Sequence, residues 1–317
     1  MKAFAINHYG ETASLADLPA PSPGPDDILV RVHAAGVNPI DWKMLDAVSR
    51  DESRAFPFVV GQDFAGVVAR SVRRDAGFSA GDRIFGVARA HGAYAEYTTV
   101  PVSDKAQPIA RIPAELSDVQ AAALPTPGLT ALAGLDALGV TSGTTVLIVG
   151  ASGAVGGFAV QMARARNARV IGSASSRNHA AVESLGGHEV IDYDREDTVA
   201  AVKAAHPGGI DAVLDLASSR DAIERIASVL KPGGRIASTI RAVDAGWMAD
   251  RGLAGMNIAL SASPASSPEG LRQLASLLVS RSISVRVQEE MPLSKAALAL
   301  RLSKEGKIVG KIVLRIS

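Results

Sequence analysis

A run of glycines between residues 150 and 157 has the spacing of a phosphate-binding turn. It reads Gly150-Ala151-Ser152-Gly153-Ala154-Val155-Gly156-Gly157, directly after the apolar stretch 146–149 and before an apolar helical stretch. Glycines there let the backbone approach a pyrophosphate, and N–H groups of the first helical turn bind its oxygens. The spacing is one residue wider at its front than the usual G-x-G-x-x-G. A tight turn without a ligand is the alternative. The run predicts a dinucleotide site formed by Gly150, Ser152, Gly153, Ala154, Val155 and Gly156.

The residues after the next expected strand favour a phosphorylated ribose. The strand 169–172 is followed by Ser173-Ala174-Ser175-Ser176-Arg177, which contains no acidic residue. An acid at this place would hold the ribose 2′-hydroxyl of NADH, whereas Ser175, Ser176 and Arg177 can hold a 2′-phosphate by charge-assisted hydrogen bonds. The two serines can also cap the helix that follows. We therefore predict NADPH as the cofactor in preference to NADH.

The chain shows two different sequence patterns, one in its N-terminal part and one in the part that contains these residues. Residues 1 to about 120 contain short strand-like segments between turns, which predicts an irregular β domain. From about residue 125, strand-like and helix-like segments alternate, which predicts a parallel sheet with helical crossovers and an α/β fold class. The expected strands are 146–149, 169–172, 189–191, 212–214 and 234–238, and the expected helices are 158–163, 179–185, 198–205 and 221–230.

The C-terminal residues return to a mixed pattern. Helices are expected at 268–281 and 294–304, and strands at 284–287 and 312–315. This pattern does not extend the parallel alternation. We therefore expect the tail to fold back onto the N-terminal β domain.

Composition excludes several classes of function. The 317 residues are 47% hydrophobic and 21% charged, with a net charge of +1 and no long basic run, so neither nucleic acid nor anionic lipid is an expected partner. The most apolar stretch is interrupted by glycines and followed by arginines, which disfavours a membrane span. The N-terminus lacks the apolar core of a signal peptide, so we expect a cytoplasmic protein. With no cysteine, the chain has no disulfide, thiolate zinc site or cysteine nucleophile.

Motifs along almost the whole chain keep the order of a known family. They make the chain resemble a medium-chain dehydrogenase/reductase of the zinc-independent quinone oxidoreductase group, and within it the enone and alkenal reductases. The motifs include Gly36-Val37-Asn38-Pro39-Ile40-Asp41-Trp42-Lys43, Gly61-Gln62-Asp63-Phe64-Ala65-Gly66-Val67-Val68, Val229-Leu230-Lys231-Pro232-Gly233-Gly234-Arg235 and Gly310-Lys311-Ile312-Val313-Leu314.

The resemblance implies a domain organisation and a cofactor chemistry. It implies a GroES-like irregular β catalytic domain at 1–123, a Rossmann NADPH-binding domain with a doubly wound parallel sheet at 124–260, and a return to the catalytic domain at 261–317. Zinc-dependent relatives need a cysteine after the first motif and a Gly-His-Glu in the second, where this chain has Asn38 and Gln62-Asp63. No catalytic metal is therefore expected. Hydride delivery to an activated double bond or a quinone is favoured over alcohol oxidation.

The resemblance and side-chain chemistry together give three residues catalytic roles. Asn38 can hydrogen-bond the substrate carbonyl or the nicotinamide ribose, because its amide both donates and accepts. Lys43 can polarise the carbonyl oxygen as negative charge develops there, although a solvated surface lysine is the alternative. Asp41, like Asp63, is expected either to orient Lys43 or to cap a turn. Tyr9, Tyr94 and water remain open as the proton donor.

Other residues are expected around the cofactor and the acceptor. Tyr193 is placed by the resemblance on the adenosine side, and Thr130 with Ser238-Thr239-Ile240 near the nicotinamide. Trp42, Met44 and Trp247 are candidates for an apolar acceptor pocket, with core packing as the alternative.

These expectations lead to one principal hypothesis and two alternatives. The principal one is an NADPH-dependent reductase of a small enone, alkenal or quinone, acting as a homodimer. The alternatives are an enoyl-thioester reductase on the same scaffold and a non-catalytic NADPH-binding redox sensor.

Overall fold

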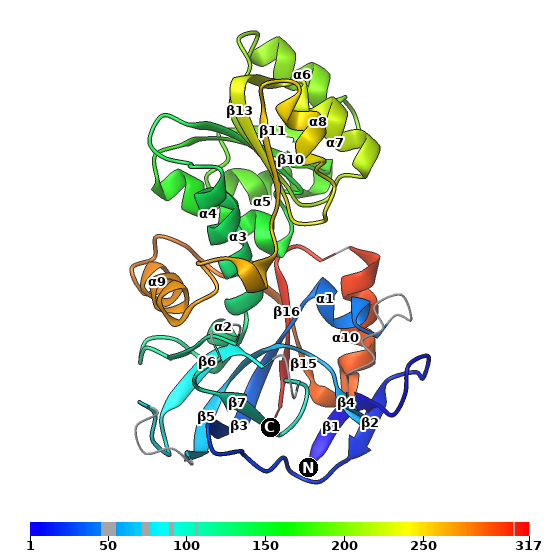
Figure 1. Ribbon diagram of the computed structural model, residues 1–317, viewed down its shortest axis with the longest axis vertical. Helices are drawn as coiled ribbons and strands as arrows, with labels where there is room; N and C mark the ends of the chain where they lie inside the picture. Colours follow the sequence, from blue (N-terminus) through cyan, green and yellow to red (C-terminus); the bar gives the residue numbers. More distant parts are fainter. Residues whose placement is uncertain (46–54, 72–76, 89–91, 105–106, 307, 317) are drawn as a thin grey trace. The chain divides into compact units, whose positions relative to one another are not determined.

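The computed structural model describes residues 1–45, 55–71, 77–88, 92–104, 107–306 and 308–316 (Figure 1). The chain divides into two compact units. Unit 1 comprises Met1–Pro127, Ser266–Val279 and Val285–Ser317, and unit 2 comprises Gly128–Ala265 and Ser280–Ser284. The chain thus has a two-domain α/β fold, as expected from its sequence.

Unit 1 is built on an antiparallel GroES-like sheet whose strands run in the order β15-β16-β3-β5-β6-β8, with β7 also paired to β3. Among the described strand pairs of this sheet, β15–β16 is parallel and the others are antiparallel. A smaller sheet has the order β2-β1-β4. The bounds are β1 (Lys2–Ile6), β2 (Ser14–Asp17), β3 (Asp27–Val37), β4 (Phe58–Val59), β5 (Asp63–Ser71), β6 (Arg83–Val87), β7 (Tyr97–Pro101), β8 (Ile109–Arg111), β15 (Val287–Pro292) and β16 (Lys311–Arg315).

The last strand of the chain lies beside one of the first. Strand β16 pairs with β3 in antiparallel register, with Ile312 opposite Val37 and Leu314 opposite Ala35, and Figure 1 shows the red strand beside the blue one. The alternating inward side chains of both strands enter the apolar core of unit 1, which also contains Phe64 and Ile84. This pairing brings Lys311 to the end of β3, where the candidate catalytic motif begins.

Short helices complete unit 1. Helix α1 directly follows β3 and contacts α10, and α2 lies against β3 and β5. Helix α3 begins in unit 1 and continues into unit 2. The bounds are α1 (Pro39–Lys43), α2 (Asp118–Ala122), α3 (Pro125–Ala137), α9 (Pro268–Val279), the 3₁₀ helix η4 (Leu293–Lys295) and α10 (Ala296–Glu305).

Unit 2 is built on a parallel six-stranded sheet of order β11-β10-β9-β12-β13-β14. The chain steps outward from β9 to β10 and β11 and then returns to β12 on the other side of β9. That reversal is the topological switch point at which α/β sheets bind ligands. The strands are β9 (Thr145–Val149), β10 (Arg169–Ala174), β11 (Glu189–Asp192), β12 (Ile210–Asp215), β13 (Leu230–Ser238) and β14 (Ala254–Asn257).

Helices of unit 2 connect and cover these strands. Helix α4 packs against β9 and β10, α5 against β10 and β11, and α7 against β13. Buried aliphatic side chains such as Leu147, Val213 and Ile236 form the core between them. The helical segments are α4 (Ala154–Ala165), the 3₁₀ helix η2 (Ser176–Asn178), α5 (His179–Ser184), α6 (Thr198–Ala205), α7 (Arg220–Ala227), α8 (Ala245–Ala249) and the 3₁₀ helix η3 (Leu260–Ala262).

One expected strand of the tail is wrong. The sequence predicts a strand at 284–287, but β15 begins at Val287 and ends at Pro292. The reason is a contact with a residue far away in the sequence, because the backbone N–H and the hydroxyl of Ser284 both donate to the Oε1 of Gln161 on α4, at 2.7 and 3.0 Å. Ser284 therefore pairs with a helix side chain and not with a neighbouring strand. Strand β14 and helix α3 were not expected from the sequence.

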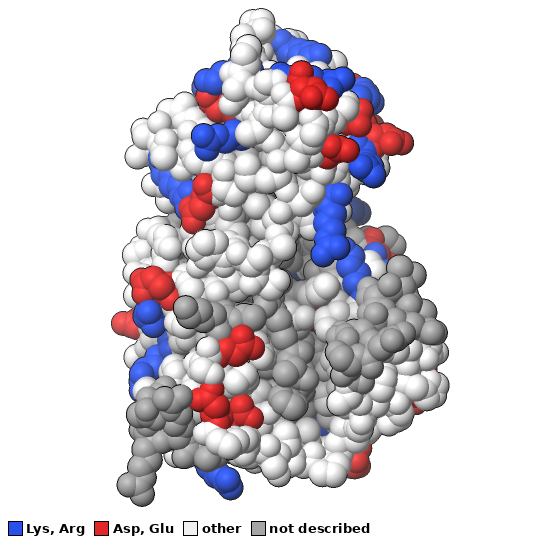
Figure 2. Space-filling view, in the orientation of Figure 1, with Lys and Arg blue, Asp and Glu red and all other residues white. Residues whose placement is uncertain are grey.

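Charge is mixed on the visible face of unit 2. On the face drawn in Figure 2, basic and acidic side chains are interspersed over unit 2 and no single sign dominates. Within the described residues, no helix is long and apolar enough to span a membrane.

Candidate functional site

The glycine run forms a tight turn between β9 and α4 in unit 2. Gly150 has φ +82°, a left-handed conformation that side chains rarely adopt, and α4 starts at Ala154 with Gly153 as its N-cap. A Cβ on Gly156 would lie 2.3 Å from the carbonyl oxygen of Gly150, so only glycine allows this close approach. A Cβ on Gly153 would meet nothing closer than 3.5 Å. The backbone of the turn is thus tightly packed at Gly156, with no room for a side chain. At Gly153, next to the N-terminus of α4, there is room for further atoms.

Strand register brings most of the other expected cofactor residues to the same edge of the sheet. Val149 at the end of β9 lies opposite Asp215 of β12 and Ser173 of β10, and Asp215 lies opposite Ser238 of β13. Parallel strands end at one edge, so the segments that follow them emerge together. The turn at Gly150 and the segments that begin at Ser175, Tyr193 and Thr239 are therefore all at the carboxyl edge of this sheet.

The serine–arginine segment has one unsatisfied hydroxyl. Ser175 is buried, and its Oγ has no hydrogen-bond partner among the residues the structure describes. A buried hydroxyl without a partner is costly, so this oxygen is suited to a ligand atom that completes its bonding. Arg177 is exposed, whereas the Ser176 hydroxyl donates to the carboxylate of Asp192. Tyr193, the next residue after Asp192, is 53% exposed.

Asp192 was not expected from the sequence to take part in this site. It is the last residue of β11, it accepts hydrogen bonds from the Ser176 hydroxyl and from the backbone N–H of Asp194, and these bonds lower the pKa of its carboxyl group. The only sequence signal is its place at the end of a strand. Its effect is to fix Ser176 at the edge of the segment that carries Arg177.

The segment after β13 is fixed by a buried carboxylate. The hydroxyl of Ser238 donates to Asp215 Oδ2 at 2.8 Å, and the backbone N–H of Thr239 donates to the Asp215 carbonyl oxygen at 3.0 Å. Asp215 is fully buried, and its other oxygen accepts from the N–H of Ser218 at 3.0 Å. Ile240 is 37% exposed. Thr130, the other residue predicted for the nicotinamide side, lies within helix α3 and not in the segment after β13.

In unit 1, Asn38 is the centre of a buried polar cluster. Its Nδ2 donates to Asp63 Oδ2 at 2.9 Å, and its Oδ1 accepts from the Nζ of Lys311 at 2.6 Å. Asp63 also accepts from the backbone N–H and the hydroxyl of Thr126, at 3.0 and 2.6 Å. Asn38, Asp63 and Lys311 are each at most 2% exposed.

Asp41 joins the same cluster from the first turn of α1. Its Oδ2 accepts from the backbone N–H of Asn38 and from the phenol of Tyr94, both at 2.8 Å, so it caps the helix in which it lies. Its Oδ1 is buried without a hydrogen-bond partner among the described residues. Burial raises the pKa of Asp41 to about 7, against the opposing effects of these two donors. Asp41 and Asp63 thus accept hydrogen bonds from Asn38, Tyr94 and Thr126, and within the described residues Lys43 donates no hydrogen bond to either carboxylate.

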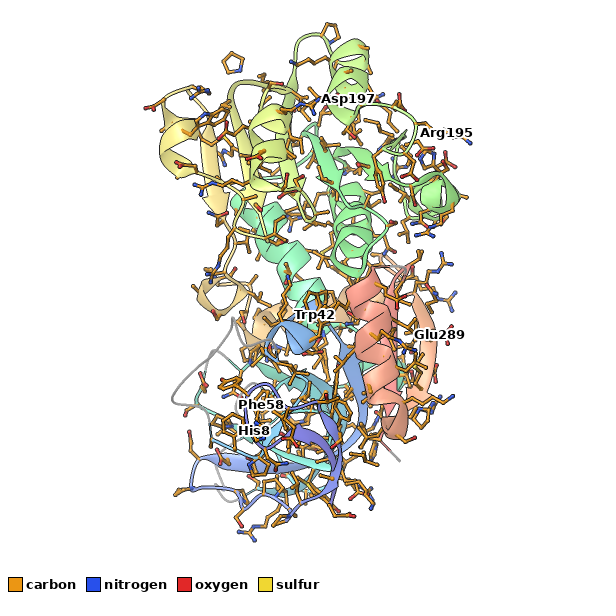
Figure 3. All side chains as sticks on the ribbon, turned by 90° about the vertical axis from the view of Figure 1, so that its right-hand side faces the viewer. His8, Trp42, Phe58, Arg195, Asp197 and Glu289 are labelled. Carbon is orange, nitrogen blue, oxygen red and sulfur yellow. The ribbon has the colours of Figure 1, made fainter. Side chains whose placement is uncertain are left out.

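The remaining candidates of unit 1 lie on and just after α1. Lys43 is exposed, with its Nζ 5.5 Å from the centroid of the Trp42 ring, and the Nζ of Lys304 lies 5.2 Å from the same centroid. Figure 3 shows Trp42 on α1 next to α10. The Sδ of Met44 accepts a hydrogen bond from Gln62 Nε2 at 3.0 Å. Trp247 belongs to unit 2, where the guanidinium of Arg251 lies 3.9 Å from its ring centroid. A pocket that joins Trp247 to Trp42 and Met44 stays a prediction.

Burial also changes the acidity of the other groups in the cluster. It raises the pKa of Asp63 and lowers that of Lys311, whose positive charge acts in the opposite sense on Asp63. It raises the pKa of the Tyr94 phenol, as does the adjacent Asp41 carboxylate. The sequence did not predict the contact of Lys311 with Asn38 or that of Tyr94 with Asp41, because these pairs are 273 and 53 positions apart. Within the described residues, no group of three or more His, Asp or Glu side chains is arranged to hold a metal ion.

Two family models match the chain. The alcohol dehydrogenase GroES-like domain matches residues 24–113, and the zinc-binding dehydrogenase family matches residues 185–314. A full-length relative is the chloroplast envelope quinone oxidoreductase homolog of Arabidopsis thaliana, 30% identical over 99% of this chain and 98% of the relative.

Solved structures with the same fold extend over the whole chain. The quinone oxidoreductase from Coxiella burnetii superposes with a TM-score of 0.89 at 31% identity and covers 100% of this chain and 99% of its own. A mycobacterial protein in complex with NADPH superposes with a TM-score of 0.86 at 27% identity, with both chains fully covered.

Proposed function

The chain belongs to the quinone oxidoreductase group of the medium-chain dehydrogenase/reductase superfamily, and on this basis we propose that it is an NADPH-dependent reductase of quinones or α,β-unsaturated carbonyl compounds. Unit 2 is the proposed cofactor domain and unit 1 the proposed catalytic domain. The observation that carries the proposal is the closed glycine turn between β9 and α4, at the switch point of the parallel sheet.

The residues of unit 2 fit a phosphorylated dinucleotide. The open space at Gly153 next to the N-terminus of α4 suits a pyrophosphate, because the free N–H groups there donate to anionic oxygens. The Ser175 hydroxyl, which has no hydrogen-bond partner among the described residues, and the exposed Arg177 suit a 2′-phosphate. Tyr193 is exposed enough to cover the adenosine, and Ser238, Thr239, Ile240 and Thr130 are the proposed residues on the nicotinamide side.

The chain's own groups supply binding and charge stabilisation to the acceptor. NADPH, when bound, supplies the hydride. Lys43 is exposed and extends its ammonium over Trp42, so it is the proposed cation that stabilises negative charge on the acceptor oxygen. Asn38 is the proposed hydrogen-bond donor to the acceptor or to the nicotinamide ribose, through the Nδ2 hydrogen that Asp63 does not take. Trp42 and Met44 contribute apolar surface for a flat conjugated molecule.

The assembly that we propose is a homodimer. Strand β14 is at the edge of the unit 2 sheet, where a second copy of the chain can add its own edge strand. Light scattering of the purified chain measures its mass, and a monomer at micromolar concentration contradicts this part of the proposal.

An acceptor panel tests the proposed activity. The rate of NADPH oxidation is measured with small quinones, 2-alkenals, cyclic enones and an enoyl thioester, each also run with NADH. We expect turnover of at least one quinone or enone, faster with NADPH. Tight NADPH binding without turnover of any acceptor contradicts an enzyme and favours a cofactor sensor, whereas exclusive turnover of the thioester favours an enoyl-thioester reductase.

A further inference from the structure

The ammonium of Lys311 is buried and has two oxygen acceptors. Its Nζ donates to the carbonyl oxygen of Val37 at 2.7 Å and to Asn38 Oδ1 at 2.6 Å, and the residue is 2% exposed. A buried lysine loses the hydration of its charge, which is why burial lowers its pKa. A buried ammonium costs desolvation free energy that an apolar side chain of similar volume would avoid. A role that requires the charge would therefore explain why a lysine stands at this position.

The two charged neighbours of Asn38 determine the orientation of its side-chain amide. Lys311 faces the oxygen, and the Asp63 carboxylate faces the nitrogen at 2.9 Å. If the amide turned over, its NH₂ group would face the ammonium and its oxygen the carboxylate. Both contacts would then be repulsive in a medium of low dielectric. The orientation is therefore held electrostatically from both ends.

The fixed amide has one remaining N–H. An asparagine side chain has two N–H donors, and one of them points to Asp63. The amide is planar, so fixing its oxygen and its first N–H also fixes the direction of the second. The Asp41 carboxylate accepts a hydrogen bond from the backbone N–H of Asn38. This bond fixes the backbone from which the Asn38 side chain extends.

We propose that Lys311 is a positioning residue, which acts through Asn38 and sets the direction of the amide N–H that Asn38 offers to the bound acceptor or to the nicotinamide ribose. The inference depends on the proposed function, because it gives a purpose to the orientation of Asn38. It assigns to the motif Gly310-Lys311-Ile312-Val313-Leu314 a role beyond closing the sheet of unit 1. The pairing of β16 with β3 is the fold element that delivers this role.

A spectroscopic test measures the orientation without any turnover. In the chain labelled with ¹⁵N-asparagine, the Asn38 side-chain amide is identified by its loss in Asn38→Asp. We expect two well-separated proton resonances that exchange slowly with water, because the amide is buried between two charges. Lys311→Met should shift these resonances and speed their exchange. Lys311→Arg, which keeps a donor and a positive charge, should preserve them in large part.

A matched control separates orientation from the loss of one positive charge. Lys203→Met removes a lysine that is exposed on α6 of unit 2, and it should leave the Asn38 resonances unchanged. If Lys311→Met does not fold, the double variant Lys311→Met/Asp63→Asn, which removes one buried charge of each sign, is compared with Asp63→Asn alone, so that the two proteins differ only at Lys311. Unchanged Asn38 resonances in the folded Lys311 variant would overturn the proposal.

A double-mutant cycle on kcat/KM tests whether Lys311 acts through Asn38. We expect Lys311→Met to lower kcat/KM roughly 10- to 100-fold, mainly through kcat, because a misdirected donor no longer meets the reacting geometry. In the Asn38→Ala background the same change should have less than about a twofold effect. Equal effects in both backgrounds contradict action through Asn38. Absence of turnover with every acceptor contradicts the proposed function instead, and the resonances then decide the positioning role by themselves.

Discussion

The phenol of Tyr94 donates a hydrogen bond of 2.8 Å to the Oδ2 of Asp41 inside unit 1, where both residues are at most 1% exposed. The same oxygen accepts the backbone N–H of Asn38. A carboxylate without a paired cation in direct contact is unfavourable in such surroundings, so Asp41 retains its proton up to a pH of about 7. The proton belongs on Oδ1, because Oδ2 already accepts from two donors.

The raised pKa of Asp41 predicts a pH dependence of stability. Its pKa rises from 3.8 to about 7 on folding, so the folded chain binds more protons than the unfolded chain between these values. The stability that this group contributes is fully present below about pH 4 and is lost as pH rises to about 7. The other charged or titratable groups facing it are Asp63, Tyr94 and Lys311, and the Asp63 charge acts in the same direction.

Asp41→Asn should remove the pH-dependent contribution of this carboxyl group to the free energy of unfolding. Between about pH 4 and pH 7 the free energy of unfolding of the wild type should fall relative to that of the variant, by up to about 1.4 kcal/mol per pH unit. Urea denaturation across this range measures it. Asp250→Asn, at an exposed position, is the control. Parallel curves for the wild type and Asp41→Asn would show that Asp41 is ionised throughout.

Two glycines of the turn should respond differently to the same substitution. Gly156→Ala places a methyl group 2.3 Å from the Gly150 carbonyl oxygen, so it should lower both the melting temperature and NADPH affinity. Gly153→Ala meets nothing closer than 3.5 Å, so the fold should tolerate it. It should still weaken NADPH binding, roughly tenfold or more, because the methyl group takes space proposed for the pyrophosphate.

Calorimetric titration and thermal unfolding separate the two glycine effects. A Gly153→Ala variant with wild-type stability and wild-type NADPH affinity would contradict a cofactor at this turn. Loss of stability in Gly156→Ala alone tests only the geometry of the turn.

Arg177 should discriminate between the two nicotinamide cofactors. Replacing it by alanine removes an exposed cation from the proposed 2′-phosphate site, so the Kd for NADPH should rise roughly 10- to 100-fold. The Kd for NADH should change little, because NADH has no 2′-phosphate. Arg169→Ala removes an exposed arginine at the start of β10, at the opposite edge of the unit 2 sheet, and serves as the control. Equal losses for NADPH and NADH would place Arg177 away from the ribose.

Ser238 should contribute to stability through its buried hydrogen bond, in addition to its proposed place on the nicotinamide side. Ser238→Ala removes the donor to the fully buried Asp215 carboxylate, and it leaves the backbone N–H of Ile240 without the oxygen it binds at 3.2 Å. A buried carboxylate that loses a hydrogen bond should cost about 1–3 kcal/mol of unfolding free energy. Denaturant unfolding measures this cost, with Ser184→Ala, at an exposed serine, as the control. A change below about 0.5 kcal/mol would contradict the importance of this bond.

Local sequence patterns predict much of unit 2 because its elements follow one another along the chain. The strand before Gly150, the glycine turn and the helix after it are consecutive, and each has its own periodicity or spacing. The expected strand at 284–287 fails because Ser284 is held by Gln161, a contact over 123 residues that no local pattern contains.

The buried cluster of unit 1 also depends on a contact between residues far apart in the sequence, which local patterns do not predict. Asn38 and Asp41 stand three positions apart in a recognisable motif, whereas Lys311 reaches Asn38 only because β16 pairs with β3. Nothing in the sequence around Lys311 distinguishes a buried ammonium from an ordinary surface lysine, the usual environment of this residue. The same holds for Asp215, whose burial follows from its central place in the parallel sheet.

The most direct test of the central claim follows a labelled hydride. NADPH that carries deuterium at the transferable C4 position is mixed with the chain and a cyclic enone, and the reduced product is analysed by mass spectrometry and NMR. We expect a saturated ketone with one deuterium at the carbon β to the carbonyl. A product without deuterium, or reduction of the carbonyl to an alcohol with the double bond intact, would contradict it.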